Sequence, residues 1–151
     1  MYNQYLNKFS MTKMEITDLP IDKKIILFDG VCNLCDNSVQ FIIKHDKNDI
    51  FRFVALQSEL GQKIIKHLGI QDRNIDSIIL YEPNIAYYYK AEAIKKIVSE
   101  LDTWHKILSF FIPNGAIGNY FYDFVAKNRY KWYGKKESCM IPTSAILNKF
   151  L

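Results

Sequence analysis

Short apolar runs alternate with stretches of helical spacing along the first half of this chain, which predicts a mixed α/β fold. Two strands and two helices are expected in alternation at residues 25–28, 33–47, 50–56 and 59–68. The first run is unbroken, as in a strand buried on both faces, and it ends at Asp29 and Gly30. Asn33 is the expected N-cap of the first helix, and Gly69 fits the end of the second. The first half therefore predicts a βαβα unit.

The second half of the chain begins with two strand-like runs and a helix, expected at residues 77–81, 85–89 and 91–101. The turn residues between the runs favour an antiparallel hairpin. Two further apolar stripes, separated by Pro113 and ending near Gly134, predict additional helices. We therefore predict an α/β, thioredoxin-like βαβαββα core with a C-terminal helical appendage. Residues 23–151 are expected to form one domain, and residues 1–22 a loosely ordered extension.

Composition narrows the class of protein. The chain has 151 residues, of which 49% are apolar and 24% charged, with a formal net charge of +4. Its Tyr and Phe residues fall mostly within the periodic segments, which favours core packing over nucleic-acid binding. No stretch approaches the roughly 18 apolar residues of a membrane span, and residues 1–20 lack the apolar run of a signal peptide. We expect a cytoplasmic protein without a membrane span or a nucleic-acid partner.

The chemistry is expected at Cys32 and Cys35, which follow the first strand and fall at the start of the first helix. Unpaired N–H groups and the dipole at a helix N-terminus favour thiolate over thiol. Three cysteines are too few for a secreted disulfide framework, and a CxxC in a reducing compartment is more often catalytic or metal-binding. We therefore predict a redox pair. Cys32, nearer the helix end and expected to be more exposed, would attack a disulfide as thiolate, and Cys35 would resolve the mixed disulfide.

Asp29 and Gly30 precede this pair, and each has a candidate role. Asp29 would accept the proton of the resolving thiol if burial raised its pKa, although its charge would oppose a thiolate at Cys32. The alternative is a turn former that accepts backbone hydrogen bonds. Both interpretations stay open at this stage. Gly30 is expected to adopt a φ that other residues avoid.

Two other classes of function compete with redox chemistry. The CxxC could bind zinc or only pack, but a zinc site usually pairs two knuckles, and Cys139 stands alone. His45, His67 and His105 are scattered along the chain and are expected to face solvent. We therefore expect no metal and no cofactor. The third class is an adaptor that uses the basic and aromatic end of the last helix, which we interpret as a solvated helix end; its residues are Lys127, Arg129, Tyr130, Lys131, Trp132, Tyr133, Lys135 and Lys136.

The segment FDGVCNLC at residues 28–35 resembles the DGxCxLC signature of the DCC family. Later blocks also look like the family, namely FRFVALQS (51–58), DSIIL (76–80), AKNRYKWYG (126–134), and Cys139 followed by Pro142. The resemblance covers about residues 23 to 150. It implies a thioredoxin-like fold and thiol-disulfide exchange with an unknown disulfide or dithiol substrate and an unknown electron donor. It also implies that Arg129 and Tyr130, in the NRY block, face the cysteines.

One departure concerns substrate capture. Thioredoxin-like enzymes usually carry a cis-proline before the third strand, where the backbone receives the substrate chain. Residues 73–77 of this chain contain no proline. Substrate capture would therefore need another solution.

Overall fold

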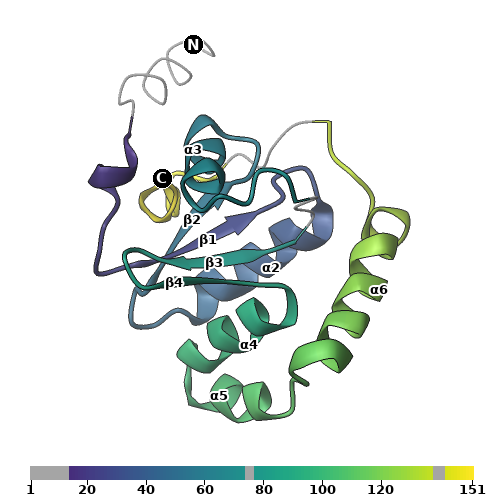
Figure 1. The fold of residues 1–151 in the computed structure, drawn as a ribbon. Helices are drawn as coiled ribbons and strands as arrows, with labels where there is room; N and C mark the ends of the chain where they lie inside the picture. Colours follow the sequence, from purple (N-terminus) through teal and green to yellow (C-terminus); the bar gives the residue numbers. More distant parts are fainter. Residues whose placement is uncertain (1–13, 74–76, 138–141) are drawn as a thin grey trace.

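The computed structural model describes residues 14–73, 77–137 and 142–151. Strands and helices follow one another in the order predicted, and their ends lie close to the expected positions (Figure 1). The elements are β1 (Lys24–Phe28), α2 (Asn33–His45), β2 (Phe51–Ala55), α3 (Glu59–His67), β3 (Ile79–Glu82), β4 (Ala86–Tyr89), α4 (Lys90–Glu100), α5 (Thr103–Phe110) and α6 (Gly115–Tyr133). Short 3-10 helices η1 (Ile16–Asp18) and η2 (Leu147–Lys149) lie toward the two ends. The predicted α/β class is confirmed.

The four strands form one mixed sheet in the order β2-β1-β3-β4. β1 pairs with β2 in parallel, which requires the α2 crossover between them. β3 pairs antiparallel with both β1 and β4, so the predicted hairpin is confirmed. Its turn contains Asn84, whose φ of 62° lies in the left-handed region that Asn tolerates better than most residues. This arrangement is consistent with a thioredoxin-like core.

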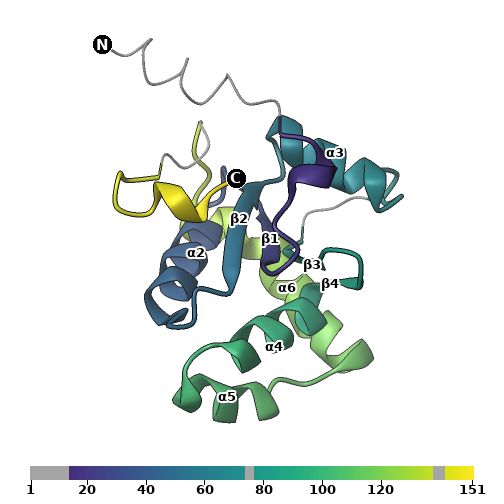
Figure 2. The ribbon, with the colours of Figure 1, turned by 90° about the vertical axis from the view of Figure 1, so that its left-hand side faces the viewer.

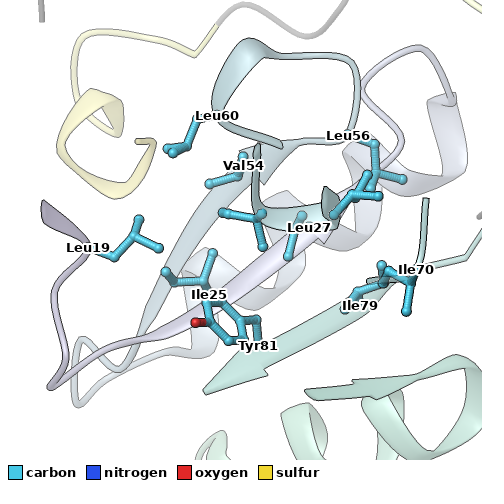
Figure 3. Close-up of a cluster of buried hydrophobic side chains, with 11 residues drawn as sticks. Leu19, Ile25, Leu27, Val54, Leu56, Leu60, Ile70, Ile79 and Tyr81 are labelled. Carbon is cyan, nitrogen blue, oxygen red and sulfur yellow. The ribbon is translucent and has the colours of Figure 1, made fainter. Parts of the chain in front are cut away.

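Alternate residues of the strands enter two separate hydrophobic clusters. Ile25 and Leu27 of β1 join the cluster beneath α3 and η1, much of which is drawn in Figure 3. Ile26 and Phe28 join the cluster on the opposite face, beneath α2 and α4. Figure 2 shows α3 and α2 on opposite sides of the sheet. The prediction that the first strand is buried on both faces is confirmed.

Both ends of the described chain contribute to these clusters. Leu19, within the segment expected to be a loose extension, is buried against the α3 face. At the other end, Leu151 donates its backbone N–H to the Phe53 carbonyl at 3.0 Å, and Phe150 packs its ring near Phe53 and Phe28. This pairing covers the outer edge of β2, where exposed backbone groups would otherwise invite association. No strand signal in the sequence indicated this contact.

The predicted helical appendage is present and consists of α5 and α6. α6 packs against both α2 and α4, so it covers the face of the sheet that carries the second cluster. Gly118 allows α6 to approach α4 closely, because a Cβ there would lie 3.0 Å from the Ala91 Cβ, and it would also lie 2.1 Å from the Pro113 carbonyl oxygen. Many apolar side chains of α5, α6 and the turn between them remain exposed, among them Trp104, Phe110, Phe111, Ile117 and Phe121. In the part of the chain that the structure describes, no helix is long and apolar enough to cross a membrane.

Candidate active site

Both predicted cysteines lie at the N-terminus of α2. Cys32 is the N-cap residue, and its carbonyl accepts the Asp36 N–H at 3.0 Å. Asn33 is the first helical residue rather than the N-cap, so that prediction is wrong by one position. The Asn33 side chain instead donates to the Tyr133 carbonyl at 2.8 Å, which ties the start of α2 to the end of α6. The strand-turn-helix context predicted for the pair is confirmed.

The expected order of exposure is wrong. Cys32 is fully buried, with 0% of its surface exposed, whereas Cys35 is half-buried. Residues 134–137, which we call the strap, leave α6 at Gly134 and pass over Cys32. Lys135 forms an isolated β-bridge with Cys32, and the Lys136 N–H donates to the Val31 carbonyl at 2.7 Å. The first turn of a helix would be open to solvent by itself, and here a distant segment covers it.

A side-chain contact also holds the strap in place. The Lys136 ammonium pairs with the carboxylate of Asp36, which is buried in the first turn of α2. Gly134 has a φ of 82°, a conformation that suits glycine at the end of α6 and directs the chain toward Cys32. The end of α6 near Gly134 was predicted, whereas the pairing of Lys136 with Asp36 was not, because these residues lie a hundred positions apart.

The two thiols differ in their electrostatic surroundings. Burial raises the pKa of Cys35 above its ordinary value of 9.0, and a hydrogen bond to the Cys32 sulfur raises it further. Arg129 acts in the opposite direction without cancelling these effects. Cys35 therefore keeps its proton and donates a hydrogen bond to the Cys32 sulfur. Both cysteines are free thiols in this structure.

Asp29 lies beside this pair and accepts hydrogen bonds on both carboxylate oxygens. Oδ1 accepts the Val31 N–H at 3.1 Å and the Gln57 amide at 2.7 Å. Oδ2 accepts from the Arg129 guanidinium at 3.2 Å and from the Tyr130 hydroxyl. The Val31 contact is a backbone hydrogen bond of the kind that the turn-forming interpretation expects, and the role of Asp29 as proton acceptor stays a prediction. The side chains of Asp29 and Arg129 are only 7% and 4% exposed, so this is a buried ion pair.

The NRY block therefore does face the cysteine site. Burial, followed by the contact with Asp29, raises the pKa of Tyr130 to about 12, so its hydroxyl remains a hydrogen-bond donor. Arg129 is buried rather than part of a solvated helix end, which corrects our interpretation of that residue. Gln57 completes the cluster, since its side-chain carbonyl accepts the Gly30 N–H at 3.1 Å. Residue patterning missed Gln57, and only its place in the FRFVALQS block could have indicated it.

Gly30 does not adopt the conformation that we expected. The glycines with positive φ in the described residues are Gly69, Gly115 and Gly134. The turn between β1 and α2 is instead stabilised by the hydrogen bonds to Asp29 and Gln57. The prediction for Gly69, at the end of α3, agrees with its φ of 67°.

A pocket of about 590 Å³ lies between α2, α4 and α6, next to this cluster. Cys35, Asp29 and Arg129 line it, and Cys32 does not. The rest of the lining is largely apolar and includes Leu34, Val39, Ile42, Ile94, Ile97, Val98, Leu101, Ile112, Phe121, Val125 and Ala126. Phe121 and Val125 are also exposed to solvent, so the pocket opens between helices rather than being sealed. The half-buried thiol of the pair therefore faces an apolar pocket.

The histidines are less scattered than the sequence indicated. The rings of His45 and His105 lie 4.6 Å apart, and both are near Asp102. Within the described ranges, these three residues form the one group of three or more His, Cys, Asp or Glu side chains close enough to share a metal ion. His67 lies elsewhere, with its ring edge against Tyr81. The group contains neither Cys32 nor Cys35, and Cys139 lies outside the described residues.

The mixed sheet, with a CxxC pair at the start of its first long helix, is consistent with a thioredoxin-like core. The chain matches the DCC1-like thiol-disulfide oxidoreductase family over residues 26–135, and it belongs to that family. It is similar to the uncharacterized protein YuxK of Bacillus subtilis, with 40% identity over 90% of this chain and 99% of that protein. It is also similar to a chloroplastic DCC family protein of Arabidopsis thaliana, with 42% identity over 78% of this chain and 70% of that protein. No solved structure matches the chain significantly.

Proposed function

We propose that this protein catalyses thiol-disulfide exchange through Cys32 and Cys35. The observation that carries the proposal is the asymmetric dithiol at the N-terminus of α2. Cys35 keeps a raised pKa and donates a hydrogen bond to the Cys32 sulfur, which lies at the N-terminus of α2. An arrangement of this kind separates a nucleophilic sulfur from a sulfur that holds its proton until the second step.

The exchange moves two electrons. The Cys32 thiolate attacks one sulfur of a substrate disulfide, a mixed disulfide forms, and the first substrate thiolate leaves and takes up a proton. Cys35 then loses its proton and attacks the Cys32 sulfur, which releases the second substrate thiolate. The substrate disulfide is reduced to two thiols, and the dithiol is oxidised to a disulfide. Because the strap covers Cys32, this step requires the strap to move aside.

We assign Asp29 a positioning role rather than the role of proton acceptor. Four donors already occupy its two carboxylate oxygens, and one of them belongs to a buried guanidinium. These contacts join the end of β1, the loop after β2 and helix α6 around the cysteines. A carboxylate used in this way fixes the turn that carries Cys32. The proposed catalytic residues are therefore Cys32 and Cys35, with Asp29 supporting their position.

Reduction of 2-hydroxyethyl disulfide, coupled to a dithiothreitol pool, tests the proposal. We expect turnover by the wild-type protein, loss of turnover in Cys32→Ser, and slower turnover in Cys35→Ser, because only dithiothreitol can then resolve the mixed disulfide at Cys32. Cys139→Ser is the matched control and should turn over like the wild type. Equal rates in all four proteins would overturn the proposal, as would tightly bound zinc that chelators release from the wild type and not from Cys32→Ser.

A further inference from the structure

We propose that the pocket between α2, α4 and α6 binds a small apolar thiol, which reduces the oxidised protein by exchange at Cys35. This inference rests on the proposed function, because it assigns the electron donor for the same cysteine pair. It also gives the pocket a use that neither the family name nor the relatives' names provide.

The two cysteine side chains have different surroundings. Cys32 has no exposed surface and lies under the strap, whereas Cys35 is half-buried and lines the pocket. A thiol that approaches through the pocket therefore meets the Cys35 sulfur and is kept from Cys32. This approach leaves the hydrogen bond between the strap and Val31 intact.

The lining sets the chemical class of the donor. Apolar side chains of α2, α4 and α6 surround a volume of about 590 Å³, which is within the usual range for small-molecule sites. Phe121 and Val125 lie at the opening and are 59% and 41% exposed, so the entrance is apolar as well. The absence of a proline in residues 73–77 also removes the usual device for holding a peptide backbone. A compact apolar molecule fits this site better than a polar peptide.

The redox step balances as the reverse half of the exchange. A donor thiolate attacks the Cys35 sulfur of the Cys32–Cys35 disulfide, and the Cys32 thiolate leaves. Cys32 is the leaving group because the pocket presents only the Cys35 sulfur to the donor. A second donor thiolate then attacks the donor sulfur in the mixed disulfide, which releases Cys35 and produces the donor disulfide. Two donor thiols are oxidised, and the cysteine pair regains two electrons.

The test compares the rates at which propyl and hexyl 2-pyridyl disulfides modify two single-cysteine proteins. The variant Cys32→Ser/Cys139→Ser retains Cys35, and the variant Cys35→Ser/Cys139→Ser retains Cys32. Each rate constant is divided by the rate constant of the same reagent with 2-mercaptoethanol, so that the difference in intrinsic reactivity between the two reagents cancels. Burial of a methylene changes a binding or rate constant by up to about fourfold. We therefore expect the protein that retains Cys35 to prefer the hexyl reagent by at least about tenfold, and the protein that retains Cys32 to show no preference.

Pocket-filling variants locate the effect. Ala126→Phe, on α6, adds a ring beside the pocket, and Ala116→Phe adds the same ring at an exposed position of α6 outside the lining. In the Cys35-retaining protein, the hexyl preference should disappear with Ala126→Phe and persist with Ala116→Phe. Ile94→Phe fills the pocket from α4 and repeats the test if Ala126→Phe fails to melt cooperatively. A preference that survives both pocket-filling variants would overturn the inference.

A failure here is distinguishable from a failure of the proposed function. The single-cysteine proteins cannot form the Cys32–Cys35 disulfide, so the chain-length preference does not depend on catalytic exchange. If the wild type turns over 2-hydroxyethyl disulfide without any chain-length preference at Cys35, exchange stands and the apolar donor is wrong. If a disulfide of the peptide Ala-Cys-Leu reacts faster at Cys35 than the hexyl reagent does, the donor is a peptide rather than a small apolar thiol.

Discussion

The two faces of the sheet are built from alternate residues of the same strands, yet they are covered differently. Beneath α3, Ile25, Leu27 and Ile64 are completely buried in a filled cluster. On the opposite face, α6 packs against α2 and α4, and a pocket of about 590 Å³ remains between the three helices. One face therefore serves the stability of the fold, and the other leaves space next to a reactive thiol.

The same contrast appears within one turn of α2. Cys32 is sealed under the strap, and Cys35, three positions later, faces the pocket. Side chains three positions apart lie on the same side of a helix, and the two sulfurs are in contact, so the different surroundings come from the segments packed around them. The comparison shows that the segments packed around a CxxC decide which sulfur is accessible.

We expect the largest loss of stability when the buried ion pair between Arg129 of α6 and Asp29, at the end of β1, is broken. Arg129→Met leaves the Asp29 carboxylate buried without its cation, which typically costs about 3–5 kcal/mol. Urea unfolding should show a loss of this size. The matched control is Lys127→Met, at an exposed position of the same helix, which should change the free energy of unfolding by less than about 0.5 kcal/mol. Similar losses in both variants would contradict the buried pair.

A second pair of variants tests the two faces directly. Ile64→Ala removes a fully buried side chain from the filled face and should cost about 2–5 kcal/mol. Ile94→Ala, at a half-buried position that lines the pocket, should cost about 1 kcal/mol or less, because the side chain already borders open space. Equal losses in chemical denaturation would mean that the pocket face is as tightly packed as the α3 face.

The raised pKa of Cys35 predicts an alkaline loss of stability in the reduced protein. The unfolded thiol ionises near its ordinary value of 9.0, whereas the folded thiol holds its proton to higher pH. Its contribution is therefore complete below pH 9 and is lost as the pH rises toward the folded value. Between pH 8 and pH 10, the urea midpoint should fall more in the wild type than in Cys35→Ala, both kept under reductant. An identical fall in the two proteins would contradict the raised pKa.

The smallest change is expected when one hydrogen bond near the strap is removed. Asn33→Ala removes the hydrogen bond to the Tyr133 carbonyl, and such a bond contributes about 0.5–1.5 kcal/mol. Alkylation of Cys32 by iodoacetamide, followed by mass spectrometry in the Cys35→Ser background, should therefore accelerate roughly two- to tenfold. Asn37→Ala, at an exposed position of the same helix, provides the comparison. If Asn33→Ala leaves the alkylation rate unchanged, this bond does not hold the strap closed.

The fold could be predicted from the sequence because local patterns determine it. The apolar run at residues 25–28, the helical spacing after it and the turn before β4 each specify one element. The order of elements then limits the topology. Boundaries shifted only slightly, since helix and strand ends depend on neighbours that the local pattern does not include.

The site was less predictable, because its decisive contacts join distant residues. Nothing near Cys32 in the sequence indicates that Lys135 and Lys136 cover it. Likewise, Arg129 has the local pattern of a solvated helix end and becomes buried only because Asp29 lies opposite it. The family resemblance indicated the importance of the NRY block without giving its partner.

Thiol-disulfide exchange by this protein is tested most simply by the redox potential of the Cys32–Cys35 pair, measured by mass-resolved alkylation across glutathione and dithiothreitol buffers. We expect a reversible two-electron transition between about −120 and −270 mV, the range of known oxidoreductases, in the wild type and in Cys139→Ser. Thiols that stay reduced across every buffer would contradict the central claim that these two cysteines form an exchangeable disulfide.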